Sequence, residues 1–230
     1  MILRPPVWVF TLARHFWTLV GAPPPYPRDL RQVLCWLPEL HVVEVPHLTV
    51  ALAVDCGRRF GLPVPELTDT RPLAGCFIGY GHQQLIIYDP LLDAAELRLT
   101  IAHETAHFLR DFDEPRRHAI ARFGPSIRDV LDGRRPPTDT ERLAGLLTDV
   151  CVTGYQHFLD RDHWGRRTSE ETDDVETAAH WLACELLAPF DELPHPVLAH
   201  RQTLAGFLVA QRGFPPTIAN HYAAEIIIND

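Results

Sequence analysis

His103 and His107 stand four residues apart, and this spacing constrains the fold more than any other feature of the sequence. On an α-helix, residues i and i+4 lie on one face, one turn apart, so two imidazoles at this spacing can bind one tetrahedral zinc ion. Glu104, beside His103, is placed to take a proton from water as a general base. In a chain with 13 histidines, a chance match to this pattern is the alternative. The pattern lies inside an expected amphipathic helix that follows two expected strands, and this position favours the metal site.

The clearest helical pattern in the sequence is an unbroken apolar repeat over residues 175–187, which Pro189 ends. Glu176 flanks this repeat and is the expected third ligand, because a catalytic zinc ion normally has three protein ligands and one open position. A solvated glutamate on a helix edge is the alternative. One turn further along, His180 is expected to hydrogen-bond a ligand or to replace one; the alternative is a partly buried helix histidine.

The remaining periodicity predicts a mixture of helices and a small sheet. Alternating β-type residues predict a short strand over 41–45 and a hairpin formed by 76–80 and 84–88. Helical spacing predicts helices over the following ranges: 10–20, 27–37, 48–60, 93–110, 138–159, 198–211 and 217–228. Asp93 is the expected N-cap of the helix that carries His103 and His107.

Three segments follow from these patterns. The proline tract at 23–25 separates an N-terminal helical appendage, residues 1–26, from a main domain over 27–195, and a C-terminal helical pair occupies 196–230. The main domain contains a long insertion, residues 111–174. The expected helix over 138–159 should pack on the main domain, because its apolar face must be buried, and should leave a polar stretch near the mouth of the site.

Composition excludes several classes of protein. The formal net charge of −9 opposes direct nucleic-acid binding, which depends on basic side chains that neutralise phosphates. Five cysteines, an odd number without CxxC spacing, suggest a reducing cytoplasm rather than a disulfide framework. No stretch approaches the ~20 apolar residues that a membrane span requires.

The segment LTIAHETAH, residues 99–107, together with ETAAHWLACELLAP, residues 176–189, resembles the ImmA/IrrE family of zinc peptidases. The second segment is similar to the family pattern E-x-x-A-N-x-F-A-A-E-L-L-M-P. The resemblance covers roughly residues 27–195 and implies that His103, His107 and Glu176 bind zinc and that Glu104 is the catalytic base. His180 stands where the family usually has Asn or Asp, and the chain between the two segments is longer than in short members.

The expected fold is therefore an α+β minimal zincin, gluzincin-like, with a small sheet, the HExxH helix and extra helices. The resemblance implies a cytoplasmic, zinc-dependent endopeptidase of narrow specificity that cleaves a protein partner, a helix-turn-helix DNA-binding repressor or a similar regulator. No direct contact with nucleic acid or membrane is expected. The alternative is a non-catalytic module in which zinc stabilises a surface that binds a repressor or antitoxin. Tyr155, His157 and His163 are candidates, by residue type alone, for stabilising the oxyanion.

Overall fold

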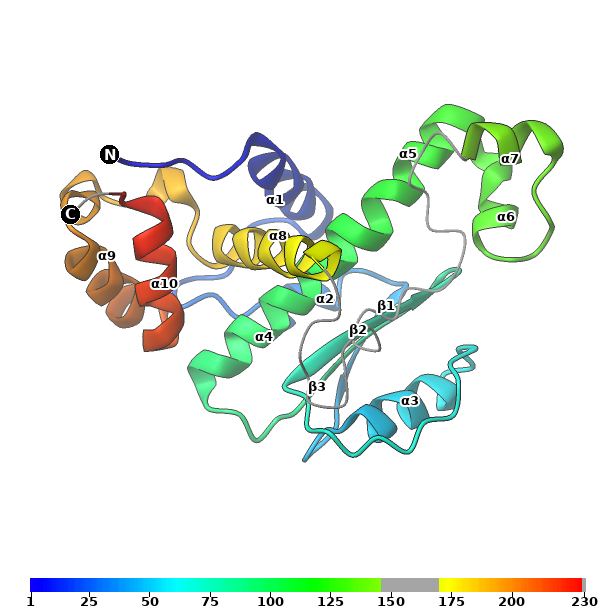
Figure 1. The fold of residues 1–230 in the computed structure, drawn as a ribbon, viewed down its shortest axis with the longest axis horizontal. Coiled ribbons are helices and arrows are strands. Elements are labelled where there is room, and N and C mark those ends of the chain that lie inside the picture. Colours follow the sequence, from blue (N-terminus) through cyan, green and yellow to red (C-terminus); the bar gives the residue numbers. More distant parts are fainter. Residues whose placement is uncertain (146–169, 229–230) are drawn as a thin grey trace.

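The computed structural model describes residues 1–145 and 170–228, and in these ranges the chain has an α+β fold (Figure 1). The α-helices and strands are α1 (Val7–Val20), α2 (Arg31–Leu34), β1 (Leu40–Glu44), α3 (Val50–Arg59), β2 (Gly75–Tyr80), β3 (Gln83–Tyr88), α4 (Ala94–His107), α5 (Glu114–Phe123), α6 (Arg128–Leu131), α7 (Asp139–Gly145), α8 (Glu170–Leu187), α9 (Arg201–Phe207) and α10 (Pro216–Ile226). π-Helical turns cover Phe108–Asp113 and Leu208–Arg212, and 3₁₀ turns cover Pro125–Ile127, Phe190–Glu192 and His195–Ala199. No helix of the described chain is both long and apolar enough to cross a bilayer.

The sheet has three strands in the order β1-β3-β2. Strands β2 and β3 pair antiparallel in the predicted hairpin, with Tyr80 opposite Gln83 across a two-residue turn. Strand β1 lies parallel to β3 on its other side, which requires a crossover, and α3 lies in that connection. The hairpin prediction is confirmed, and the sheet is mixed.

Alternation of side chains along the strands builds two cores on opposite faces of the sheet. Cys76, Ile78 and Leu85 point toward α3 and form one buried cluster with its apolar residues. Phe77 and Ile86 point to the other face and join the larger helical core. The sheet therefore lies between α3 and α4, as Figure 1 shows.

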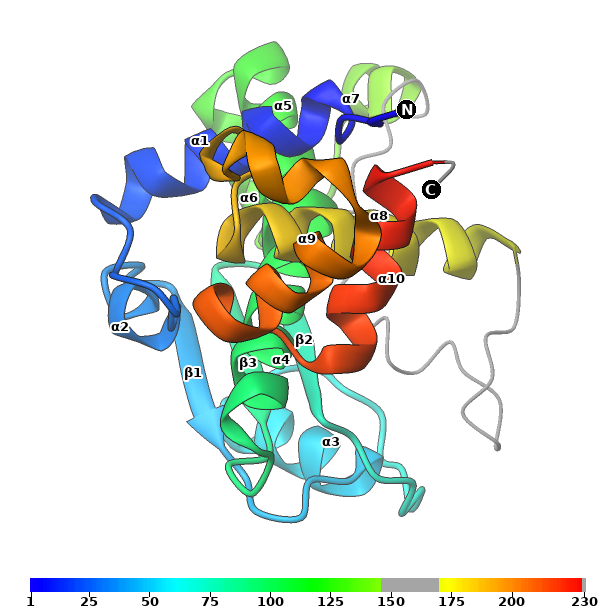
Figure 2. The same ribbon diagram turned by 90° about the vertical axis from the view of Figure 1, so that its left-hand side faces the viewer.

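The larger core is shared by helices from both ends of the chain. Helix α8 packs against α4 on one side and α1 on another (Figure 2). Buried residues of α1, α4, α8, α9 and α10 belong to a single hydrophobic cluster. A β-bridge between Ile2 and Ile227 joins the two ends of the described chain. The boundaries expected at residues 26 and 195 thus separate segments that contribute to the same core.

The helix that carries His103 and His107 is longer than predicted. Asp93 caps it as expected, since its carboxylate accepts hydrogen bonds from the backbone N–H groups of Ala95 and Glu96 at 2.9 and 3.0 Å. The helical path then continues beyond residue 110, through the π-helical turn at Phe108–Asp113 and α5, to Phe123. Pro115 explains the discrepancy: proline disfavours helix interiors, but it is tolerated here in the first turn of α5.

The other differences concern shorter elements. The helix predicted over 27–37 is reduced to the single turn of α2. The predicted helix over 138–159 begins as α7, and its continuation over 146–169 lies outside the described residues. The polar stretch that was expected near the mouth of the site lies largely in the same undescribed segment.

Helix α8 ends at a buried carboxylate. Glu185 is 4% exposed, and its Oε2 accepts a hydrogen bond from the backbone N–H of Phe190 at 3.0 Å. This bond secures the turn after Pro189. Burial raises the pKa of Glu185 from 4.5 to about 7, and the hydrogen bond from Phe190 only partly opposes that effect.

The sheet and the π-helical turn are closely packed at Gly79. A Cβ atom on Gly79 would lie 2.6 Å from the ring of Phe112 and 2.9 Å from that of Phe77. We expect Gly79→Ala to lower the free energy of unfolding by about 1–3 kcal/mol, because both rings are buried and must shift. In urea unfolding, Gly206→Ala is the control: it lies in open space on α9 and should be neutral or stabilising. Equal stability of the Gly79 variant and the wild type would contradict this packing.

The pKa of Glu185 predicts a pH-dependent stability. Between pH 4.5 and about 7, Glu185 keeps its proton in the folded chain but loses it in the unfolded chain. Its contribution to the free energy of unfolding is therefore lost as pH rises through about 7. Relative to wild type, Glu185→Gln should gain about 2–3 kcal/mol of unfolding free energy between pH 5 and pH 8. Glu66, whose side chain is 80% exposed, supplies the control variant Glu66→Gln, which should follow wild type. If the free energies of unfolding of Glu185→Gln and wild type changed with pH in parallel, the raised pKa of Glu185 would be refuted.

Candidate metal centre

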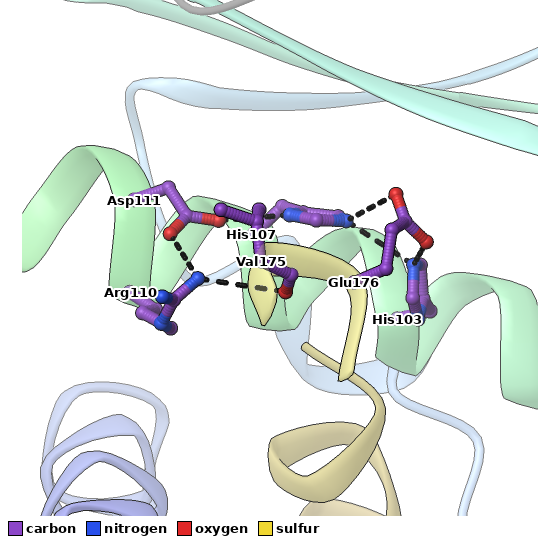
Figure 3. A network of polar contacts seen from close by, with 6 residues as sticks. All are labelled: His103, His107, Arg110, Asp111, Val175 and Glu176. Carbon is purple, nitrogen blue, oxygen red and sulfur yellow. Dashed lines mark hydrogen bonds and ion pairs between the residues drawn. The ribbon is translucent and has the colours of Figure 1, made fainter. Parts of the chain in front are cut away.

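Two crossing helices bring together the three side chains that the sequence singles out as ligands. His103 and His107 lie one turn apart on α4, and their Nε2 atoms are 3.1 Å apart. Glu176 reaches them from α8, with Oε2 at 3.3 Å from Nε2 of His103 and Oε1 at 3.7 Å from Nε2 of His107. Figure 3 shows the carboxylate facing both rings. These three residues form one group whose ligand atoms could hold a metal ion.

The separations suit a zinc ion. Ligand atoms about 2 Å from a common tetrahedral centre lie roughly 3.3 Å from one another. The two Nε2 atoms are 3.1 Å apart, and one oxygen of Glu176 lies 3.3 Å from His103 while the other lies 3.7 Å from His107, so the contacts are close to this spacing. Two imidazoles and one carboxylate are also a ligand set that zinc accepts in catalytic sites. The side chain of His103 is 22% exposed, whereas those of His107 and Glu176 are only 4% and 8% exposed.

A fourth side chain, Asp111, fixes the orientation of His107. Its Oδ2 lies 2.8 Å from Nδ1 of His107. Because a carboxylate can only accept, Nδ1 carries the proton, which leaves Nε2, the atom that faces His103 and Glu176, as the one that could bind a metal ion. The sequence reasoning missed Asp111. The available signal was its spacing: it follows His107 by four residues on the same helical path.

Arg110 ties this arrangement to α8. Its Nη1 lies 2.6 Å from Oδ1 of Asp111 and donates to the backbone carbonyl of Val175 at 3.5 Å (Figure 3). Its guanidinium also stands over the ring of Trp8, 5.8 Å from the ring centre, so α1 supports the same corner. Arg110 therefore contacts both Asp111, the partner of His107, and Val175, the residue before Glu176.

Glu104 is buried on the side of α4 that faces the sheet. It is 8% exposed and lies against β2, where a Cβ atom on Gly75 would be 3.3 Å from Cγ of Glu104 and 2.6 Å from Thr100. Glycine at position 75 thus allows the close approach of strand and helix that the glutamate requires. Glu104 does not belong to the group of ligand atoms formed by His103, His107 and Glu176.

His180 lies one turn from Glu176 on α8, but it falls in a different group of side chains, with His221 and Glu225 of α10. Burial, with smaller contributions from His103 and His221, lowers the pKa of His180 from 6.5 to about 4. His180 is therefore neutral near pH 7. The candidate oxyanion donors Tyr155, His157 and His163 lie outside the described residues.

The contact between His107 and Asp111 predicts a metal-binding defect. Asp111→Asn removes the negative charge and weakens the hold on the Nδ1 proton, so we expect a 10–100-fold lower affinity for zinc. A chelator-competition titration that resolves individual equivalents measures it. Asp113→Asn is the matched control, because Asp113 lies on the same helical path and pairs with Arg117 at 2.7 Å. Wild-type affinity in Asp111→Asn would contradict the orienting role.

In comparisons with known proteins, no family model, no curated protein and no solved structure matches this chain.

Proposed function

We propose that this chain is a zinc-dependent endopeptidase of narrow specificity with a zincin-like fold, related to the ImmA/IrrE peptidases. The observation that carries the proposal is the convergence of His103, His107 and Glu176 from two helices at zinc-like separations. The contact between Asp111 and His107 adds support, because metal-binding histidines are commonly oriented by a carboxylate.

The residues divide the chemistry among them. When bound, zinc supplies a Lewis acid that polarises a peptide carbonyl and makes water more acidic. His103, His107 and Glu176 would hold the ion. Glu104, adjacent to His103, would accept a proton from the attacking water and return it to the leaving amine. Its Cγ packs closely against Gly75 of β2.

The sheet supports a peptide as the substrate. Strand β2 is an edge strand of the sheet, and Glu104 packs against its first residue, Gly75. An extended peptide can add to a sheet edge through main-chain hydrogen bonds, which would carry its backbone past Glu104. The requirement for an extended, accessible segment favours cleavage of a flexible stretch in one protein partner. By the resemblance of the two sequence segments, that partner would be a helix-turn-helix repressor or a similar regulator.

Separate substitutions distinguish the catalytic base from a ligand. Glu104→Gln should retain zinc and lower peptide cleavage by 10²–10⁴-fold, because it removes only the proton acceptor. Glu176→Ala should lose both peptide cleavage and zinc. The measurement combines elemental analysis with mass spectrometry of new N-termini in a peptide library, and Glu96→Gln in the first turn of α4 is the control.

The same experiment tests the alternative of a zinc-stabilised binding module. In that case zinc binding would be retained, and Glu104→Gln would behave like wild type. If Glu176→Ala kept full zinc affinity, the proposed ligand set would be wrong.

A further inference from the structure

Helices α8 and α10 bring a second set of metal-binding side chains together. His180 of α8 and His221 and Glu225 of α10 offer one ligand atom each, all within 4.8 Å of one another. Nε2 of His221 lies 3.2 Å from Oε1 of Glu225, and the ring centres of His180 and His221 are 5.7 Å apart. We propose that these three residues form a second binding site for a divalent transition-metal ion, distinct from the centre at His103, His107 and Glu176.

The carboxylate of Glu225 is the strongest reason to expect a ligand. Its Oε1 contacts His221, but its Oε2 is buried and has no hydrogen-bond partner among the described residues. A buried carboxylate oxygen without a partner costs free energy, and a bound cation would offset that cost. Oε2 of Glu225 is thus an acceptor beside two imidazoles, where a bound cation would supply the partner that it lacks.

The framework around these residues is closely packed. Tyr222, between the two α10 ligands in sequence, is fully buried and packs edge-on against Trp181, with ring centres 5.5 Å apart. On its other side it stacks on Phe214 at 6.3 Å. Trp181 follows His180 directly on α8, so these aromatic contacts fix the positions from which the ligands of both helices project. Such preorganisation reduces the conformational cost of metal binding.

The donor set selects the class of ion. Two imidazole nitrogens and one carboxylate oxygen favour zinc, cobalt, nickel or copper over magnesium or calcium, which prefer oxygen ligands alone. Cys184 lies near the set, with Sγ at 3.7 Å from Nε2 of His180. The group whose ligand atoms lie within 4.8 Å of one another consists of His180, His221 and Glu225, without Cys184. The side chain of His221 is 64% exposed and leaves the group open to solvent.

The second site has a structural consequence that does not depend on peptidase activity. An ion bound there would link α10 to α8, one turn along from Glu176. Occupancy would therefore stabilise the packing of the C-terminal helix against the helix that supplies the third ligand of the first centre.

Titration of the metal-free chain with cobalt(II) tests the proposal. We expect wild type to bind two equivalents and His221→Ala to bind one fewer, with its absorption spectrum retaining only the bands of the first centre. Glu225→Gln should weaken the same equivalent by at least tenfold. His221 is exposed, so its removal leaves the core intact, and circular dichroism can verify the fold.

His118→Ala is the matched control, because His118 is also exposed and pairs with a glutamate four residues away, Glu114 at 3.9 Å, but the described residues supply no third ligand there. This variant should bind as wild type does. The proposal is overturned if His221→Ala binds the same number of equivalents with the same affinity as wild type. Hydrogen exchange provides a second readout: cobalt should slow exchange over 216–226 in wild type but not in His221→Ala.

Discussion

The crossing of α8 over α4 is the contact on which the rest of the structure depends. It buries apolar residues of both helices in the larger core and determines where Glu176 meets His103 and His107. Arg110 reinforces the crossing through Asp111 on one helix and the carbonyl of Val175 on the other. Packing and site geometry are therefore coupled, because any shift of one helix along the other changes the separations among the ligand atoms.

The two sequence segments that carry the candidate chemistry were also the easiest to assign to secondary structure. HExxH spacing and the apolar repeat over 175–187 are local patterns, and both lie on helices, with His103, His107 and Glu176 adjacent in space. The hairpin and the Asp93 cap are equally local and were predicted correctly.

Features that depend on distant parts of the chain could not be predicted. The parallel pairing of β1 with β3 and the inclusion of α1 in the core follow from tertiary packing. The helix beyond residue 110 persists because a π-helical turn and the N-terminal position of Pro115 accommodate a residue that usually ends helices. The spacing of His180 from Glu176 predicts either a contact with a ligand of the first centre or a partly buried helix histidine; its grouping with His221 depends on how α10 folds back.

The arrangement of the first ligand set has a further consequence for the unfolded chain. His107 and Glu176 are connected by a segment of roughly 70 residues, so an ion bound by both helices would close a long loop. Bringing both ligands to one ion in an otherwise unfolded chain would cost about 4 kcal/mol of chain entropy, so the unfolded chain would bind the ion less tightly than the folded chain does. An ion that prefers the folded chain in this way raises its free energy of unfolding, by an amount that increases with the metal concentration.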